Sequence, residues 1–323
     1  MSTLELLQLN LLSPVILAFF LGILATLVRS DLRFPEELYQ ALSLYLLLAI
    51  GLKGGVAMVS SPEGGLLLPM AAAVAISACT PLWCMPILRI FGKLDKANAA
   101  AIGAHYGSVS VVTFLAATAF LSGVGEESEG FLPALVAVME VPGIVVALLL
   151  INSRHSSKAQ THWLDSLRTV ITGKSVFLLL GGLGIGALVG EKGFAPVEPF
   201  FSTPFKGVLC LFLLEMGMVA SRRFKDLRKV GAFLLIFAMV MPIIHAALGI
   251  VVGHFTGLSR GGSFMLGVLC ASASYIAAPA TIRLAIPQAN PAYYLTSALA
   301  ITFPFNLTVG IPLYYTLSGL IAG

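Results

Sequence analysis

Long hydrophobic runs, separated by short polar segments, follow one another along the chain. Runs of about 18 or more apolar residues are long enough to cross the hydrocarbon core of a bilayer as a helix. The pattern predicts ten spans, at residues 11–28, 38–58, 65–91, 99–121, 131–152, 175–190, 204–221, 230–253, 262–285 and 292–319. We therefore expect an all-α polytopic membrane protein with ten transmembrane helices.

The composition excludes a water-soluble domain. Hydrophobic residues make up 58% of the 323 and charged residues 11%, whereas a soluble domain carries about a quarter charged residues. The mean hydropathy is +0.96. The sequence contains no H-E-x-x-H motif and no nucleotide-binding loop. We therefore expect no enzyme, no cofactor and no nucleic-acid partner, and any active transport across the surrounding lipid bilayer must draw on an ion gradient.

The basic residues separate into two groups when the polar segments are assigned alternately to two sides. One side receives most of the Lys and Arg residues, and the other only Lys192, Lys206 and Arg260 with the acidic segment 126–129. By the positive-inside rule the first side is cytoplasmic, which places both termini outside the plasma (inner) membrane. No Lys or Arg precedes the first run and no Ala-x-Ala site follows it, so we expect a retained helix rather than a cleaved signal peptide.

Landmarks recur between the two halves of the chain at offsets of 161 to 164 positions. The pairs are Gly55 and Gly217, Pro81 and Pro242, Ser108-x-Ser110 and Ser272-x-Ser274, and Pro142 and Pro304. The offset predicts two five-helix repeats, residues 1–152 and 175–323, joined by a cytoplasmic loop at 153–174. Because five is odd, the second repeat must be inverted relative to the first, which is a plan of secondary transporters.

Two polar interruptions lie at equivalent places, in the fourth span of each repeat. They read GAHYGSVSVV at residues 103–112 and CASASYIAAP at residues 270–279. Glycine and proline break a regular helix, and serine supplies hydroxyl donors. Irregular backbone at this depth is tolerated only where it is buried in protein or lines a water-filled cavity. The N–H groups of the resulting half-helix N-termini favour an anion.

These interruptions supply the candidate substrate-binding residues. They are Gly107, Ser108, Val109, Ser110 and Thr113 in the first half, and Ser272, Ala273 and Ser274 in the second. The alternative is helix packing, because small residues bring transmembrane helices close together and serine can bond the carbonyl four residues earlier without any ligand. The recurrence at equivalent positions favours binding.

Lys53, Glu140 and Glu215 lie well inside predicted spans, where charge is costly and usually faces a cavity or a partner. Lys53 and Glu215 are 162 positions apart, so we expect a buried pair, which either pins the bundle or leaves Lys53 as a charge beside an anion site. Glu140, just before a proline, either coordinates Na+ or carries a proton, or is a neutral acid bonded to a neighbour. We expect His105 and His245 to be hydrogen-bonded packing residues.

Several stretches are specific enough to suggest a family: ASASYIAAPATIRLAIPQANPAYY above all, with GLKGGVAM, EVPGIVVA, MGMVASRRFKDLRKV and MPIIH. Through them the sequence resembles the cyanobacterial sodium-dependent bicarbonate transporters of the SbtA type, over nearly the whole chain. The resemblance implies inverted repeats arranged as core and gate domains, a homotrimer and elevator-like movement. It also implies bicarbonate held between two broken helices with Na+ alongside, and inhibition by a PII-like regulatory protein that binds adenine nucleotides.

The resemblance extends to several residues of the family's site. Ser110, Thr113, Ser272 and Ser274 match its polar site residues, and Glu140 stands where the family carries an aspartate.

The chain also departs from the family pattern. Val111 and Val112 stand where the family has a glycine and a serine, Tyr275 replaces an aspartate, and Lys53 and Glu215 replace uncharged residues. The lost aspartate removes a natural Na+ ligand while Lys53 adds a cation. We therefore hypothesise that Lys53 takes over the charge balance and makes transport independent of Na+ or linked to protons.

The expected function is secondary active transport of a small anion. Bicarbonate uptake coupled to a Na+ or proton gradient is the first interpretation. One alternative keeps the fold and changes the substrate to another small carboxylate or anion. The other is a non-transporting membrane sensor that signals through the loop at 153–174.

Overall fold

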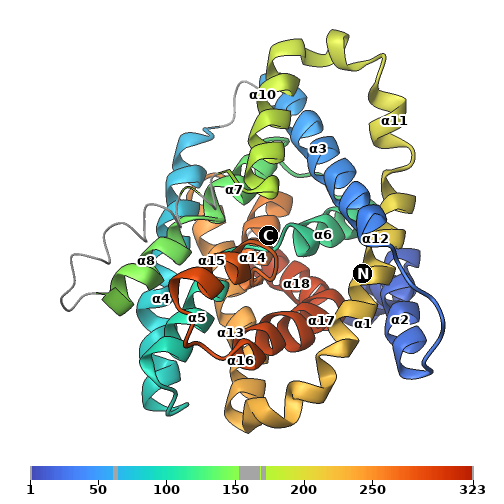
Figure 1. Cartoon of the computed structure of the whole chain (residues 1–323). Coiled ribbons are helices and arrows are strands. Elements are labelled where there is room, and N and C mark those ends of the chain that lie inside the picture. Colours follow the sequence, from blue (N-terminus) through green and yellow to red (C-terminus); the bar gives the residue numbers. More distant parts are fainter. Residues whose placement is uncertain (1, 61–64, 153–167, 169–171, 322–323) are drawn as a thin grey trace.

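The computed structural model describes residues 2–60, 65–152, 168 and 172–321, and every regular element in these ranges is a helix (Figure 1). Most of the predicted cytoplasmic loop at 153–174 lies outside the described residues. The α-helices are α1 Thr3–Leu11, α2 Pro14–Leu27, α3 Glu36–Ser60, α4 Leu67–Ile90, α5 Lys96–Gly107, α6 Val111–Val124, α7 Leu132–Met139, α8 Pro142–Asn152, α10 Lys174–Phe194, α11 Glu198–Ser202, α12 Phe205–Arg222, α13 Leu227–Phe255, α14 Arg260–Ala271, α15 Ala277–Ala285, α16 Pro291–Leu295, α17 Phe303–Phe305 and α18 Ile311–Ile321. A short 3₁₀ helix spans Phe224–Asp226, and π-helical segments span Thr296–Thr302 and Asn306–Gly310.

The described helices include enough long apolar segments for a polytopic membrane protein. Seven are long and apolar enough to cross a bilayer, or eight if the bent pair α1 and α2 forms one span. One of the seven stretches, Glu198–Phe255, contains the separate helices α12 and α13. The predicted class of protein is confirmed. Each predicted span falls on a helix or on helices interrupted by a break, but the count of ten crossings stays a prediction.

Local sequence explains where several helices begin and end. Ser13 accepts a hydrogen bond from the backbone N–H of Ile16 at the start of α2, and Pro14 follows at the first helical position, where its missing N–H costs nothing. Asp95 caps α5 in the same way. At the other end of the first broken span, α6 stops at Gly125, whose φ of 70° is a left-handed conformation that glycine adopts without strain.

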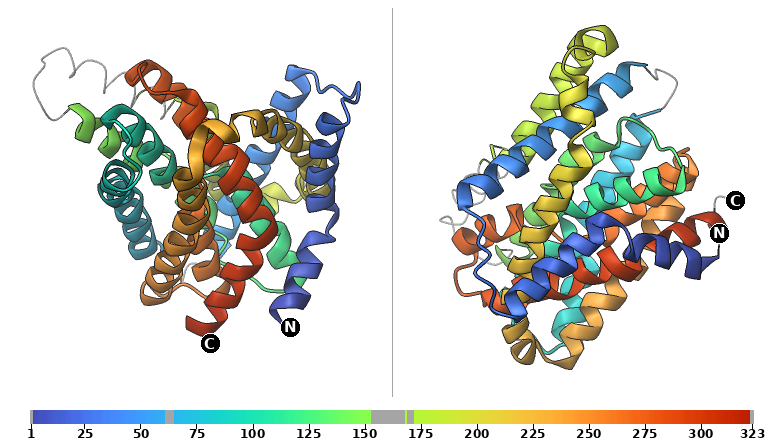
Figure 2. Two further views of the ribbon diagram at one scale, coloured as in Figure 1. Left: turned by 90° about the horizontal axis from the view of Figure 1, so that it is seen from below. Right: turned by 90° about the vertical axis from the view of Figure 1, so that its right-hand side faces the viewer.

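Close backbone contacts join two pairs of helices. In α3, a Cβ on Gly55 would overlap the carbonyl oxygen of Leu183 in α10, and in α12, a Cβ on Gly217 would overlap that of Phe19 in α2. Small residues allow transmembrane helices to approach in this way. Figures 1 and 2 show α3 and α10 side by side.

The remaining helices pack into a second group. Helix α5 contacts α4 and α8, and α14 contacts α13, with α18 and the π-helical segments beside them. The N-terminal helix α1 packs against α18, so both ends of the chain lie at the same end of the molecule (Figure 2). An even number of crossings would produce this arrangement.

Candidate functional site

Two helix breaks lie near the centre of the molecule, at the places where the sequence predicts interruptions (Figure 1). Helix α5 ends at Gly107 and α6 begins at Val111, with extended backbone at Ser108 and Ser110. Helix α14 ends at Ala271 and α15 begins at Ala277. Each break therefore leaves a helix C-terminus and a helix N-terminus inside the protein.

The two breaks contact each other directly. The backbone N–H of Ser110 donates to the hydroxyl oxygen of Ser272 over 2.8 Å, and the backbone N–H of Ser274 donates to the carbonyl oxygen of His105 over 2.8 Å. Each break thus supplies a hydrogen-bond partner that the other would lack. Buried backbone groups are almost always paired, so these bonds hold the two breaks in a fixed register.

The serine hydroxyls also organise their own segments. Ser110 caps α6 by accepting from the backbone N–H of Thr113 over 3.2 Å. The hydroxyl of Ser274 accepts from the backbone N–H of Ala278 in α15 over 3.1 Å. The hydroxyl of Ser272 donates to the carbonyl of Leu269 over 2.8 Å. The predicted serines are therefore structural members of the breaks as well as candidate ligand donors.

The first break is anchored to the junction between α7 and α8. The Ser108 hydroxyl donates to the backbone carbonyl of Glu140 over 2.9 Å. The Ser77 hydroxyl donates to the Gly107 carbonyl over 2.6 Å and accepts from the backbone N–H of Gly143 over 3.1 Å. A Cβ on Gly143 would overlap Gly107. Sequence reasoning missed Ser77, although a lone mid-span serine is a signal that could have found it.

The second break is anchored by an amide that sequence reasoning also missed. The side-chain nitrogen of Asn306 donates to the Ala271 carbonyl over 2.9 Å, at the end of α14. The Asn306 side-chain oxygen accepts from the Tyr314 hydroxyl over 2.7 Å, which fixes the orientation of the amide. A polar amide in the middle of the last predicted span was the available signal.

A cavity of about 10 Å³ lies where the breaks meet. Its lining residues come from both breaks, from the α7–α8 junction and from α10: Val109, Ser110, Val111, Glu140, Ser175, Ser274, Tyr275, Ile276 and Ala277. About 10–15 Å³ is needed to hold one water molecule, so the cavity accepts a single water-sized species. A bicarbonate ion has four non-hydrogen atoms and requires the lining groups to move apart.

Several predicted residues lie behind this lining rather than in it. Val109, Ser110 and Ser274 line the cavity. The others, Gly107, Ser108, Thr113, Ser272 and Ala273, are buried around the breaks. They shape the backbone rather than face the cavity in this conformation.

The side chain of Glu140 places a carboxylate in the lining of the central cavity. Its side chain is 2% exposed, and its Oε2 has no hydrogen-bond partner among the described residues. The N-termini of α6 and α15 reach the same cavity at Val111 and Ala277, and their partial positive charge offsets part of the carboxylate charge. An unpaired buried carboxylate is costly, so a cation or a proton at Glu140 would stabilise this arrangement.

Tyr275 lies in the wall of the central cavity, at the position where the family pattern described in the sequence analysis has an aspartate. Its hydroxyl is buried close to Ser110 but makes no hydrogen bond of normal geometry with a described residue. Its ring packs against Phe303 with centroids 5.0 Å apart. The side chain therefore offers a neutral hydroxyl donor to the cavity instead of a negative charge.

The predicted pair of Lys53 and Glu215 is wrong. The Lys53 ammonium lies 5.6 Å from the centre of the Phe205 ring, in a separate cavity of about 380 Å³ that Lys206 and Glu129 also line. Phe205 begins α12, whereas Glu215 follows ten residues later, which is about 15 Å along a helix. The lysine side chain cannot span that distance. Lys53 consequently does not supply the charge at the central cavity.

The remaining candidates lie outside the cavity lining. Glu215 is 7% exposed and its Oε2 has no partner among the described residues. His105 Nδ1 is 2.7 Å from the Ala101 carbonyl oxygen, and His245 Nε2 accepts from the Trp83 indole N–H over 2.8 Å. Both histidines make the packing contacts expected of them.

The apolar helices define a polytopic membrane protein, and its two central helix breaks are of the kind found in secondary transporters. A family model described as the Na+-dependent bicarbonate transporter superfamily matches residues 14–319. The chain belongs to the Na+-dependent bicarbonate transporter superfamily, which confirms the family suggested by the sequence. No curated protein sequence matched the chain significantly.

Proposed function

We propose that the protein is a secondary active transporter that moves bicarbonate across the plasma membrane, coupled to a Na+ or proton gradient. The observation that carries this proposal is the meeting of two helix breaks, joined by the bond from Ser110 to Ser272, at a buried cavity that contains Glu140. Breaks of this kind place half-helix ends around a substrate at the middle of the bilayer in secondary transporters.

The chemistry of the cavity suits a small anion with hydrogen-bond acceptors. The N-termini of α6 and α15 present backbone N–H groups, and the hydroxyls of Ser110, Ser274 and Tyr275 are within the lining. Bicarbonate has three oxygens that accept such bonds. Because these donors are held in the helix breaks or at the helix ends beside them, a small planar anion fits this set better than a long or apolar substrate.

Glu140 is the proposed coupling residue. Half-helix C-termini and unwound carbonyls coordinate Na+ in transporters with broken helices, and α5 and α14 both end beside the cavity. A carboxylate among such groups can hold Na+ or take a proton. In this proposal the cation or proton compensates Glu140 and admits the anion, a role that the sequence hypothesis gave to Lys53.

Contacts between equivalent positions support two inverted repeats. The indole of Trp83 donates to His245, 162 positions later, and the first break bonds to its counterpart, the second break, through Ser110 and Ser272. The close glycine contact of α3 on α10 has a counterpart in that of α12 on α2. Self-pairing of equivalent positions is expected where an internal two-fold axis passes between them.

We propose elevator-like movement, which the two groups of helices support. We assign α2, α3, α10 and α12 to a gate domain and the helices that carry the breaks to a core domain. A second cavity of about 10 Å³ lies between the two groups, next to the first helix break. Leu46 of α3, Phe212 of α12 and Val111 of α6 are among its lining residues. The cavity around Lys53 and Lys206 lies between the same two groups, on the side predicted to face outward, where it would attract an anion.

The assembly and regulation are part of the same proposal. We propose a homotrimer with both termini outside and a PII-like regulatory protein on the cytoplasmic face. The loop at 153–174, which would meet that regulator, lies mostly outside the described residues. A different small carboxylate is the second candidate substrate, favoured by Val111, Val112 and Tyr275, which replace a glycine, a serine and an aspartate of the resembling family.

Uptake of labelled bicarbonate into proteoliposomes tests the function. We expect accumulation above equilibrium with an inward Na+ or proton gradient, and none in protein-free liposomes. A panel of competing anions identifies the substrate, because only the true substrate competes fully. Label that binds without crossing the membrane would instead indicate a sensor and would refute the proposal.

A further inference from the structure

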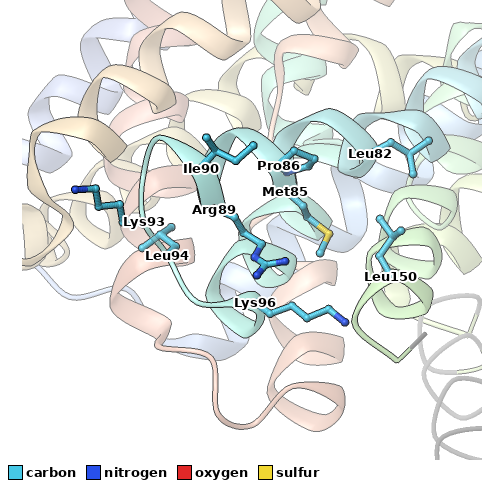
Figure 3. Close-up of a pocket in the computed structure, with 9 residues that line it drawn as sticks. All are labelled: Leu82, Met85, Pro86, Arg89, Ile90, Lys93, Leu94, Lys96 and Leu150. Atoms are coloured by element: carbon cyan, nitrogen blue, oxygen red, sulfur yellow. The ribbon is translucent and has the colours of Figure 1, made fainter. Parts of the chain in front are cut away.

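Another cavity lies far from the helix breaks, where α4 ends, α5 begins and α8 ends (Figure 3). Its volume is about 910 Å³. The lining combines the basic side chains Arg89, Lys93 and Lys96 with apolar ones that include Leu82, Met85 and Leu150. Figure 3 shows Arg89 and Lys96 on the same side of the loop as Met85, whereas Lys93 points away from them.

The positive charge in this cavity has no compensating carboxylate among the described residues. The ion pairs within the described part of the chain lie elsewhere, at Asp226 and Glu126, and none of them includes Arg89, Lys93 or Lys96. The nearby Asp95 carboxylate caps α5 instead, accepting from the backbone N–H of Asn98 over 2.9 Å. Lys96 donates one hydrogen bond to the Ile151 carbonyl over 2.9 Å, and an ammonium group has three donors. Within the described part of the chain, Arg89 and Lys96 therefore retain unused donors and a net positive charge.

The cavity lies at a boundary between apolar and polar surface. On the span side, Leu82 and Ile90 are 49% and 67% exposed, as expected of side chains that face lipid. On the loop side are the basic residues. A soluble anion would leave the apolar part of the cavity unused, and an apolar ligand would leave the arginine unpaired. A ligand with a phosphate and hydrocarbon chains satisfies both parts.

We propose that this cavity binds an anionic phospholipid, with its phosphate at Arg89 and Lys96 and its acyl chains over Leu82, Met85 and Leu150. Arginine recognises phosphate through paired N–H donors, and basic pockets between helices on the cytoplasmic side of membranes bind anionic headgroups. That this cavity faces the cytoplasmic leaflet rests on the proposed orientation, with both termini outside. The site is separate from the central cavity, because Lys96 and Gly107 are the first and last of the 12 residues of α5, about 17 Å apart along the helix.

Native mass spectrometry of the purified protein tests the lipid site independently of transport. Phosphatidylglycerol and phosphatidylcholine with identical acyl chains are added at equal concentration, and the retained lipids are counted. We expect tighter retention of phosphatidylglycerol, a reduction of about tenfold in Arg89→Gln and in Arg89→Gln/Lys96→Gln, and recovery in Arg89→Lys. The matched control is Lys225→Gln/Arg228→Gln, which removes two exposed basic side chains elsewhere on the predicted cytoplasmic side.

The possible results separate the sources of phosphate. Equal retention of phosphatidylglycerol and phosphatidylcholine would overturn the proposal, because the site would then not recognise an anionic headgroup. An equal loss of phosphatidylglycerol in Lys225→Gln/Arg228→Gln and in Arg89→Gln would also overturn it, because retention would then depend on the total positive charge of the protein and not on this cavity. Addition of inorganic phosphate is the second arm. If it displaces phosphatidylglycerol, the site binds a soluble anion and the lipid assignment is wrong, whereas unchanged retention supports it. Thermal unfolding of each variant verifies that it is folded.

Discussion

The backbone N–H of Ser110 donates a 2.8 Å hydrogen bond to the hydroxyl of Ser272, a residue that stands 162 positions later in the chain. The reciprocal bond, from Ser274 to the carbonyl of His105, has the same length. Neither break can satisfy its backbone alone, and no water-exposed surface is available at this depth. The geometry of the central cavity therefore depends on both halves at once.

Replacing Ser272 with alanine removes the acceptor for the Ser110 N–H. An unsatisfied buried donor costs about 1–3 kcal/mol, so we expect a lower melting temperature in detergent and weaker bicarbonate uptake. Ser122→Ala is the matched control, since Ser122 is exposed and bonds only within its own helix. Equal stability and uptake in the two variants would mean that the contact between the breaks contributes nothing.

Glu140→Gln tests the coupling residue. The variant keeps the shape of the side chain and removes its charge. Interactions with a charged group contribute about 1.5–3 kcal/mol, so uptake should fall about tenfold or more, and its dependence on Na+ or pH should disappear. Glu140→Asp should retain part of the dependence. Gradient-driven uptake that is unchanged in Glu140→Gln would remove this residue from the mechanism.

Gly143→Ala tests the anchor of the first break. The new Cβ would overlap the Gly107 backbone, and overpacking typically costs about 1–3 kcal/mol. We expect reduced thermal stability and a larger loss of transport, because α5 ends at the cavity. In Gly181→Ala, where the Cβ meets nothing within 4 Å, stability should be unchanged or rise by up to about 1 kcal/mol. Comparable stability in both variants would argue against a tight contact.

Lys53→Gln tests the outer cavity as an entrance for anions. The lysine lies above Phe205 and away from the helix breaks, so we expect KM to rise about threefold or more at low ionic strength while kcat is preserved. Added salt should reduce the difference by screening. Lys192→Gln, an exposed change on the same predicted side, is the control. A loss of kcat or of the Na+ requirement would instead favour a role at the central cavity.

Asp95 gives a prediction about pH outside the membrane. Burial tends to raise the pKa of its carboxyl, but hydrogen bonds from the backbone and side chain of Asn98 outweigh this and lower the pKa below its usual value. Ionised Asp95 is therefore favoured by folding, and its contribution is complete above the usual value of about 3.9. It is lost as the pH falls through the lower folded value.

Variants of Asp95 can be compared by thermal unfolding. At neutral pH, Asp95→Ala should cost about 1 kcal/mol and Asp95→Asn less, because asparagine also caps helices. Below about pH 3.9 the advantage of the wild type over Asp95→Asn should disappear as the carboxylate is protonated. An advantage that is constant down to acid pH would show that the charge contributes nothing.

Hydrophobic patterning was enough to predict the helices and the two breaks. The bilayer fixes the length of an apolar run that crosses it. Glycine, serine and proline in the middle of such a run indicate a helix break, whatever the rest of the fold is. This is why the interruptions at 103–112 and 270–279 were found without a structure. The family resemblance then suggested bicarbonate as the substrate, which patterning alone could not.

The sequence could not predict the direction in which a side chain points or the height at which a residue lies relative to residues of neighbouring helices. Equivalent positions in two halves suggested that Lys53 meets Glu215, but the height of each residue along its helix keeps the two apart. The anchors Ser77 and Asn306 were missed because a single polar residue within a span has many possible partners. Their roles emerge only when the helices that they bridge are known.

The cross-bonded breaks also constrain how this polypeptide can be divided. A fragment that ends near residue 152 would bury the Ser110 N–H and the His105 carbonyl without their hydrogen-bond partners. In the complementary fragment, the Ser272 hydroxyl and the Ser274 N–H would lose the same two bonds. We therefore expect that neither half folds on its own. Coexpressed halves should reassemble with each other, whereas either one alone should be degraded.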